Sequence, residues 1–342
     1  MRVLVVGGAG YIGSHALRLL ARAGHLVWAY DNLTDGHRAA VPPGLLIEGD
    51  LHDGARLENV LREHSIEAVM HFAAYAQVGE SMLDPARYYH NNIAGTLSLL
   101  EAMRRAGVTR IVFSSTTATY GAPRTMPITE DEPQRPINPY GFTKMVAEQA
   151  LQDYARAYGF ATAALRYFNA AGASLDGGIG EAHTPESHLI PNVLKVALGQ
   201  ASRLVIHGND YPTADGTCVR DYVHVDDLAD AHLRALDALR PGAALQLNLG
   251  SGTGYSVQQV LDACRVVTGH AIDAVVGPRR PGDPPILVAD ASRANALLGW
   301  SASRSDLHTI VSSAWQWHRS HPDGYGDSAG ASAPARQSQE LA

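Results

Sequence analysis

Val3-Leu4-Val5-Val6-Gly7-Gly8-Ala9-Gly10-Tyr11-Ile12-Gly13 is the stretch of sequence that decides the fold. Its first four residues are apolar and mostly β-branched, which is typical of a buried parallel strand. A glycine-rich turn follows, and the apolar periodicity after it predicts a helix from about Ser14 to Ala23. A strand, a glycine turn and a helix in this order predict the first unit of a doubly wound α/β fold.

The glycines of this turn have the spacing GxxGxxG, which suits a dinucleotide. Gly7 and Gly10 permit a tight turn and a close approach of the backbone to a pyrophosphate, while Gly13 lets the helix pack closely on the strand. The helix N-terminus offers free amides to the phosphates. A glycine motif alone also fits a purely structural turn, but its place between strand and helix favours nucleotide binding, with Tyr11 and Ile12 among the contacts.

An acidic residue after the second predicted strand, Leu26 to Tyr30, bears on the choice of cofactor. The Asp31 carboxylate can accept hydrogen bonds from the adenosine ribose and would repel a 2′-phosphate. Asn32-Leu33 follows it, with no arginine, so NAD is predicted rather than NADP. The alternative is that Asp31 only caps a turn.

Two other strand ends are predicted to contact the cofactor. Asp50-Leu51 is placed at the edge of the adenine, and Phe72-Ala73-Ala74 supplies small residues where the cofactor backbone passes.

Strand and helix patterns alternate as far as about Asn169. This order predicts a Rossmann-type doubly wound parallel sheet over residues 1–170, with a smaller mixed α/β substrate lobe over residues 171–320. Val223–Val225 and Leu245–Leu249 are expected to return to the first lobe, within 221–250. Further strands and helices are predicted at Leu45–Glu48, Ala68–Phe72, Arg110–Ser114, Thr162–Tyr167, Asn91–Ala106 and Tyr140–Tyr158.

From residue 321 to 342 the chain is rich in Gly, Ser, Ala, Pro and Gln, and this composition predicts a disordered tail.

Composition excludes several classes of function. The 342 residues are 46% hydrophobic and 18% charged, as in a soluble globular protein, and the net charge of −7 argues against a nucleic-acid partner. Two cysteines, Cys218 and Cys264, predict a reduced, cytoplasmic protein. No apolar run of membrane-spanning length and no signal peptide is recognised. The sixteen histidines are scattered without a standard ligand motif, so no metal is predicted.

A tyrosine and a lysine at helical spacing mark the predicted reacting centre. Only two of the 27 basic Lys and Arg residues are lysines, and one of them, Lys144, lies four residues after Tyr140. That spacing puts both side chains on one helix face, where the ammonium can lower the pKa of the phenol and hold ribose hydroxyls. The spacing alone also fits a chance pair on a solvated helix.

A run of hydroxyls, Ser114-Ser115-Thr116-Thr117, closes the strand before that helix. Open α/β sheets bind ligands at the carboxyl ends of their strands, so the run is expected to face the nicotinamide. Serine and threonine also satisfy the backbone of ordinary turns, and that reading stays open for each hydroxyl.

The chain resembles the extended short-chain dehydrogenase/reductase family, and within it the UDP-glucose 4-epimerases, from Met1 to about Trp317. The resemblance is carried by these segments: GGAGYIG, DNL at Asp31, HFAA at His71, VGES at Val78, YYHNN at Tyr88, FSSTTATYG, NPYGFTK, RYFNAAGA at Arg166, DGTCVRDYVHVDDLA at Asp215 and RRPGDP at Arg279. Several of these segments lie outside the cofactor fingerprint. They imply a nucleotide-sugar site rather than that of a generic dehydrogenase.

The resemblance implies a role for each matching residue. Tyr140 matches the active-site base, Lys144 its partner that also holds the ribose, and Thr116 the hydroxyl that bonds the reacting 4′-oxygen. Asn92, Ser114 and Tyr167 match positions near the cofactor. The uridine diphosphate is expected at Asn169, His188, Leu189, His207, Arg220, Arg279 and Asp283, and the sugar beside Leu287.

Some positions depart from the commonest family pattern. Ala76 stands where many relatives have a lysine that touches the cofactor phosphates, so that contact is expected to be missing. His188 and His207 replace Asn and Phe around the uridine. Leu287 replaces a bulky tyrosine beside the sugar in some relatives, and a smaller side chain there would admit a 2-acetamido group.

The predicted activity is interconversion of UDP-galactose and UDP-glucose by transient oxidation at C4, with NAD retained and Tyr140 as base. A 4,6-dehydratase is disfavoured, because Thr117 and Ala118 stand where that enzyme needs an acid pair. Epimerases of UDP-N-acetylhexosamines or UDP-pentoses remain alternatives, as does a non-catalytic NAD-sensing or scaffold protein. The resemblance also implies a homodimer.

Overall fold

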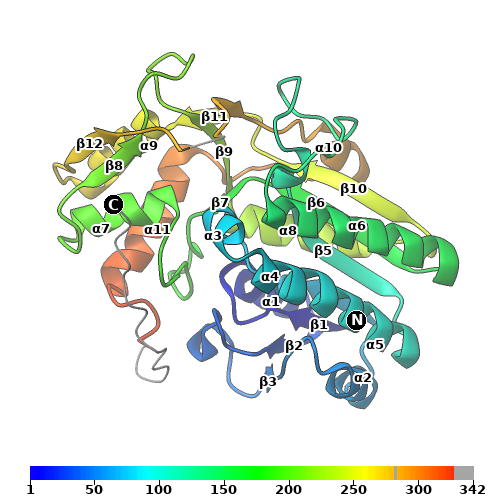
Figure 1. Cartoon of the computed structure of the whole chain (residues 1–342). Helices are drawn as coiled ribbons and strands as arrows, with labels where there is room; N and C mark the ends of the chain where they lie inside the picture. Colours follow the sequence, from blue (N-terminus) through cyan, green and yellow to red (C-terminus); the bar gives the residue numbers. More distant parts are fainter. Residues whose placement is uncertain (281–282, 327–342) are drawn as a thin grey trace.

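The computed structural model describes residues 1–280 and 283–326. Its centre is a seven-stranded, wholly parallel sheet (Figure 1). In spatial order the strands are β10 (Ala244–Leu249), β6 (Ala161–Tyr167), β5 (Arg110–Thr116), β4 (Ala68–His71), β1 (Arg2–Val6), β2 (Leu26–Asp31) and β3 (Leu46–Glu48). The order reverses between β1 and β4, the place where doubly wound sheets bind ligands. The predicted fold class is confirmed.

Helices cover both faces of this sheet and bury its side chains in two layers. In β1, Val3 and Val5 face one layer, while Leu4 and Val6 face the other. The first layer is formed by α1 (Tyr11–Arg22), α8 (Val225–Ala238) and α10 (Ser292–Leu298), and the second by α2 (Gly54–Glu63), α5 (Gly95–Ala106) and α6 (Pro139–Tyr158). Strands buried on both faces explain why β1 is apolar throughout rather than alternating.

A second group of elements forms what we call the smaller lobe, seen at the upper left of Figure 1. It has its own apolar core. Its members are β7 (Asn169–Ala171), β8 (Leu204–His207), β9 (Val219–His224), β11 (Gly254–Ser256), β12 (Ala274–Gly277), β13 (Ile286–Leu287), α7 (Leu189–Ala197), α9 (Val257–Thr268) and α11 (Leu307–Ser320). β9 pairs with β7, β11 and β13, and β8 pairs with β12.

Short helices complete the described chain. They are η1 (Arg38–Ala40), α3 (Val78–Leu83), α4 (Pro85–Tyr88), the π-helix η2 (Tyr89–Ala94) and η3 (Thr117–Tyr120). None of the helices in the described residues combines the length and apolar character needed to cross a bilayer.

Three sequence-based predictions of local structure are refined or corrected by the structure. Val223–Val225 reaches the first lobe by packing and not by strand pairing: Val223 lies in the first core layer and Val225 begins α8, although β9 pairs with strands of the smaller lobe. Leu245–Leu249 joins the large sheet as part of β10. The helix predicted over Asn91–Ala106 is split, since its first residues belong to the π-helix. Residues 321–326 are packed, with the Tyr325 hydroxyl 3.1 Å from Gly180 N and O. The rest of the predicted tail, 327–342, lies outside the described residues.

Candidate functional site

The glycine turn between β1 and α1 is shaped as a cradle that side chains would fill. Gly7 has φ +81°, and a Cβ there would lie 2.4 Å from Ala73 N. A Cβ on Gly13 would lie 2.1 Å from the carbonyl oxygen of Gly7. Gly10 is the N-cap of α1 and provides no side-chain cap, so the first helical amides have no acceptor within the helix. The turn therefore fits the pyrophosphate of a dinucleotide.

Asp31 ends β2 and is tied to this turn. Its Oδ2 accepts a hydrogen bond from Ala9 N and its Oδ1 from Leu33 N, both at 2.9 Å. Burial raises the pKa of Asp31, and the two backbone hydrogen bonds oppose the rise. A carboxylate has about four acceptor positions, so Asp31 can hold the turn and still accept from a ribose.

The neighbouring cofactor candidates lie along the same edge of the sheet. Asn32 Nδ2 donates to Asp50 Oδ2 at 2.8 Å, and Leu51 is buried against Gly95 of α5. Phe72, Ala73 and Ala74 directly follow β4, and Ala73 N lies against Gly7. The structure thus gathers these residues around the switch point between β1 and β4.

Four further candidates, Asn92, Ser114, Tyr167 and Tyr11, are held in place by side-chain and backbone hydrogen bonds. Asn92 lies in the π-helix; its Oδ1 accepts from Tyr75 N at 3.0 Å, and its Nδ2 donates to Thr143 Oγ1 at 3.1 Å. Ser114 Oγ is hydrogen bonded to the hydroxyl of Tyr167 across β5 and β6. The Tyr11 hydroxyl donates to Gly172 O at 2.6 Å, and Ile12 packs against the first core layer.

Tyr140, Lys144 and Thr116 converge at the carboxyl end of β5. α6 begins just before Tyr140, because the Asn138 side chain caps it at Gly141 N (2.8 Å) and Pro139 occupies its first turn. Lys144 Nζ donates to Ser114 O at 2.8 Å, and the Thr116 side chain is hydrogen bonded to Tyr140. The three predicted reacting groups are therefore brought together.

Burial controls the protonation of these groups. It raises the pKa of Tyr140 to about 12, although the hydrogen bond with Thr116 opposes the rise. It lowers the pKa of Lys144 to about 7, against the attraction of Glu148. The lowered phenol pKa expected from the Tyr-Lys spacing is not seen, because loss of hydration outweighs the effect of the Thr116 hydrogen bond.

The candidates for uridine diphosphate binding lie mainly around β9 and β13 of the smaller lobe. Arg220 forms an ion pair with Asp283, and Leu287 is paired with Arg220 in register. Asn169 Nδ2 donates to Asp221 O at 2.9 Å. Arg279 instead pairs with Asp210 at 2.6 Å and lies over the Tyr211 ring. Both arginines are thus held by carboxylates that a diphosphate would have to replace or join.

The two histidine candidates lie in different surroundings. His207 ends β8, next to Gly208, where an added Cβ would meet Arg279. His188 precedes Leu189, the first residue of α7, and its Nδ1 lies 2.7 Å from Glu181 Oε1. Burial would lower the pKa of His188, but Glu181 and Glu186 overcome this and raise it to about 10.

Sequence reasoning missed two polar groups. One is a buried network in which Glu148 of α6 pairs with Arg166 of β6, and Arg166 also donates to the Tyr120 hydroxyl at 2.8 Å. The other unites Glu181, His183, Glu186 and His188, although no standard motif marks their spacing. Glu148 and Arg166 lie within a predicted helix and a predicted strand, so their ion pair could have been suspected from the sequence. The cluster of glutamates and histidines forms only through the path of the loop that carries it.

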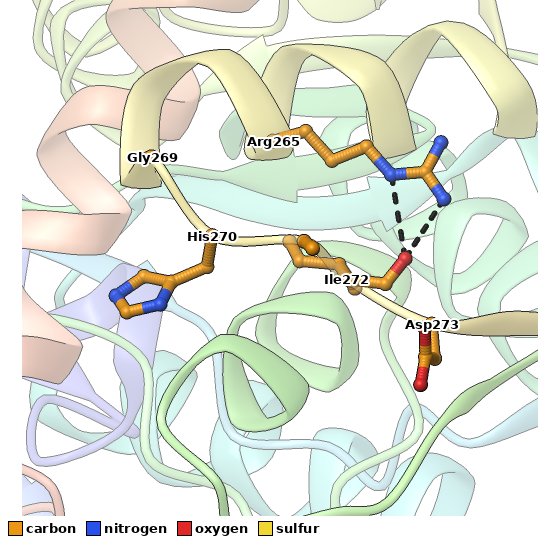
Figure 2. A pocket seen from close by; sticks show the side chains of 6 residues that line it. Arg265, Gly269, His270, Ile272 and Asp273 are labelled. Atoms are coloured by element: carbon orange, nitrogen blue, oxygen red, sulfur yellow. Dashed lines mark hydrogen bonds between the residues drawn. The ribbon is translucent and has the colours of Figure 1, made fainter.

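A separate pocket, shown in Figure 2, lies between the end of α9 and the start of β12. The Arg265 guanidinium donates to the carbonyl oxygen of Ile272 there, at 2.8 Å from Nη2. The described residues that line this pocket include none of the predicted site residues.

Known proteins resemble this chain over almost its whole length. Residues 3–250 match the NAD dependent epimerase/dehydratase family. The UDP-glucose 4-epimerase of Halalkalibacterium halodurans is 50% identical over 326 residues, which are 95% of this chain and 98% of that protein.

Two crystal structures have the same fold. The UDP-glucose 4-epimerase from Brucella ovis in complex with NAD has a TM-score of 0.89 and 50% identity, covering 92% of this chain and 97% of its own. That from Bifidobacterium longum in complex with NAD+ and UDP has a TM-score of 0.91 and 39% identity, covering 95% and 100%.

Proposed function

The chain belongs to the NAD dependent epimerase/dehydratase family, and on that premise we propose that Tyr140 is the group that exchanges a proton with the sugar. The protein is an NAD-dependent isomerase that interconverts UDP-glucose and UDP-galactose. The observation that carries the proposal for Tyr140 is its convergence with Thr116 and Lys144 at the carboxyl end of β5, on the same edge of the parallel sheet as the glycine cradle that follows β1.

When bound, NAD supplies a reversible hydride acceptor for C4 of the hexose. The residues proposed to hold it are the glycine turn, Asp31, Asn92 and Lys144, whose ammonium suits the ribose hydroxyls. Ser114 O keeps that ammonium in place through one hydrogen bond, which leaves two further N–H donors free to turn toward a ligand.

In the proposed reaction, Tyr140 takes the proton from the 4-hydroxyl as C4 is oxidised and later gives it back. Thr116, hydrogen bonded to Tyr140, orients the phenol and can share the bond to the 4-oxygen. Net inversion requires the 4-keto sugar to present its other face while the diphosphate stays anchored. We assign that anchoring to Asn169, Arg220 and Arg279. Asp283 is assigned to a ribose hydroxyl, and His188, Leu189 and His207 are placed near the uridine.

Burial of Tyr140 sets the energetic demand on this step. Moving a phenol pKa from about 12 toward neutrality costs several pKa units, each about 1.4 kcal/mol. Two positive charges, the Lys144 ammonium and the oxidised nicotinamide, are the proposed sources of this stabilisation.

A panel of nucleotide sugars tests the proposed substrate range. UDP-glucose, UDP-galactose, UDP-N-acetylglucosamine and a UDP-pentose are incubated separately with the purified protein and followed by NMR. The UDP-hexoses should interconvert.

Leu287 on β13, in register with Arg220, favours activity on the acetamido sugar as well. Loss of that second activity in Leu287→Tyr, with hexose turnover retained, would support Leu287 as the determinant; equal activity in both proteins would reject it.

We also propose that the protein is a cytoplasmic homodimer. Both cysteines are free, which suits a reducing compartment. Tyr89 of η2, Leu97 of α5 and Phe142 of α6 are 40%, 42% and 40% exposed, and the Tyr89 and Phe142 rings are in contact. Such exposed apolar side chains suit an interface.

Light scattering should give twice the chain mass, and Leu97→Asp should shift the measured mass toward that of the monomer. A monomeric wild-type protein would contradict the proposal.

A further inference from the structure

A cluster of two glutamates and two histidines lies in the segment between β7 and α7. Glu181, His183, Glu186 and His188 each offer one ligand atom, and these atoms lie within 4.8 Å of one another. Nδ1 of His183 and Nδ1 of His188 converge on Glu181 Oε1, at 3.0 and 2.7 Å. The same two atoms lie 3.9 and 2.9 Å from Glu186 Oε2 and Oε1.

The two carboxylates are buried while the two imidazoles are partly open to solvent. The side chains of Glu181 and Glu186 are only 4% and 2% exposed, against 30% and 44% for the two histidines. Within residues 1–280 and 283–326, neither carboxylate forms an ion pair with a lysine or arginine. Buried carboxylates need a positive partner, which here is either the two imidazoles in their protonated form or, in place of those protons, a divalent cation. A divalent cation held by two carboxylates and two neutral imidazoles would leave the cluster uncharged.

We propose that Glu181, His183, Glu186 and His188 bind one Zn²⁺ ion. Two imidazole nitrogens and two carboxylate oxygens form a donor set that Zn²⁺ accepts in tetrahedral geometry, whereas Mg²⁺ and Ca²⁺ prefer oxygen alone. With bonds of about 2.0–2.2 Å, tetrahedral donors lie roughly 3.3–3.6 Å apart. The four His–Glu separations run from 2.7 to 3.9 Å and all four donors lie within 4.8 Å of one another, so ligation requires side-chain movements of about an ångström.

The backbone that carries these ligands is anchored from several elements. Trp317 Nε1 of α11 donates to Glu181 O at 3.0 Å, and His37 Nε2 lies 2.7 Å from Ala182 O. Glu186 Oε1 accepts hydrogen bonds from Ser187 N and His188 N, both at 2.8 Å. The ligand positions are therefore largely set by the fold, which lowers the cost of binding an ion.

The location gives the ion a structural role. The ring of Tyr11, in the glycine turn, lies edge-on to the His183 ring at 6.2 Å, and His188 directly precedes α7 of the smaller lobe. An ion at this point links the cofactor turn to the smaller lobe. All four positions are filled by protein ligands, so the site is closed, as in structural rather than catalytic zinc sites.

The test measures metal directly on the full-length protein with its NAD. After treatment with a chelator, the protein is mixed with one equivalent of Zn²⁺, gel-filtered and analysed for metal by mass spectrometry. We expect about one Zn²⁺ per chain and a melting temperature that rises with Zn²⁺ but not with Mg²⁺ or Ca²⁺. Co²⁺ in the same site should give the intense visible absorption of a four-coordinate ion.

Matched variants locate the site. His183→Gln and His188→Gln each remove one ligand and should retain about a tenth or less of the wild-type zinc. His270→Gln, an exposed histidine at the pocket of Figure 2, should retain it fully. The proposal is overturned if the wild-type protein keeps no zinc after filtration, or if both ligand variants keep as much as the control. The wild-type measurement decides the question even if a variant fails to fold.

Discussion

Tyr140 is the proposed proton carrier, but its phenol is buried, and burial disfavours the phenolate form that accepts a proton. Burial holds its pKa at about 12 in the protein alone, so the proton-accepting form depends on positive charge beside it. Lys144 is one such charge, although burial lowers its own pKa to about 7. In the proposed reaction, cofactor and substrate binding therefore have to lower the pKa of the Tyr140 phenol.

Tyr140→Phe tests this role at the level of one residue. The substitution removes the hydroxyl that exchanges the proton but keeps the ring, which packs edge-on near Tyr88. Turnover of UDP-galactose should fall by about 10²–10⁴-fold, while bound NAD, measured after denaturation, stays at the wild-type level. Activity within a few-fold of wild type would remove Tyr140 as the proton carrier.

Among single residues, the grouping of Tyr140, Lys144 and Thr116 could be predicted from the sequence. The ion pairs of Arg220 and His188 could not. Tyr140, Lys144 and Thr116 belong to one helix and the preceding strand, so spacing and strand ends suffice to bring them together. Arg220 meets Asp283 only through pairing of β9 with β13, and His188 meets Glu181 only through the path of a loop. Contacts of that kind leave no periodic signal in the sequence.

At the scale of elements, the packing of α1 on β1 depends on two glycines in different ways. A Cβ on Gly13 would lie 2.1 Å from the Gly7 carbonyl oxygen, whereas a Cβ on Gly10 meets the same atom at 3.4 Å. Gly13→Ala should therefore lower the melting temperature of the protein. Gly10→Ala should preserve the melting temperature of the NAD-free protein but reduce NAD content, because the methyl group occupies space for the pyrophosphate. Equal losses of stability in both variants would contradict the assignment of a packing role to Gly13 and a cofactor-binding role to Gly10.

The ion pair between α6 and β6 gives a second prediction for elements. Glu148 and Arg166 have side chains only 1% and 5% exposed. Glu148→Gln leaves a buried guanidinium without its charge partner, so the free energy of unfolding in urea should fall by about 3–5 kcal/mol. Glu101→Gln, which breaks a pair at the surface of α5, is the control and should lose much less. A small effect of Glu148→Gln would show that the network adds little stability.

Element boundaries show where sequence patterns stop being informative. The helix predicted from Ser14 begins at Tyr11, because a glycine N-cap without a side-chain cap gives no polar signal. The π-helix over Tyr89–Ala94 cannot be told from an α-helix in the sequence, because it runs directly into α5 at Gly95. β9 was recognisable as a strand, but local sequence does not specify which sheet it joins.

For the whole molecule, buried neutral histidines make stability depend on pH. Burial lowers the pKa of His71 to about 3 and that of His232 to about 4, from an ordinary 6.5. Between about pH 6.5 and 4 the unfolded chain binds protons that the folded chain refuses, so stability falls as the pH falls. This loss ends once the pH drops below the folded pKa values.

His232→Leu isolates one contribution to that dependence. His232 Nε2 has no hydrogen-bond partner among the residues that the structure describes, and its ring lies beside Phe72 and Tyr167, so leucine suits the position. The slope of unfolding free energy against pH should decrease by up to about 1.4 kcal/mol per pH unit between pH 6.5 and 4. His308→Leu, at an exposed position, serves as control. An unchanged slope in His232→Leu would show that this histidine is protonated in the folded protein.

The central claim is that the protein oxidises C4 reversibly with the cofactor it holds and with Tyr140 as proton carrier. The most direct measurement follows UDP-galactose deuterated at C4, in ordinary water with no NAD added, by NMR. We expect conversion to UDP-glucose with deuterium retained at C4, because the hydride leaves for the bound cofactor and returns from it, and no conversion by Tyr140→Phe. Replacement of the deuterium by solvent hydrogen would contradict it.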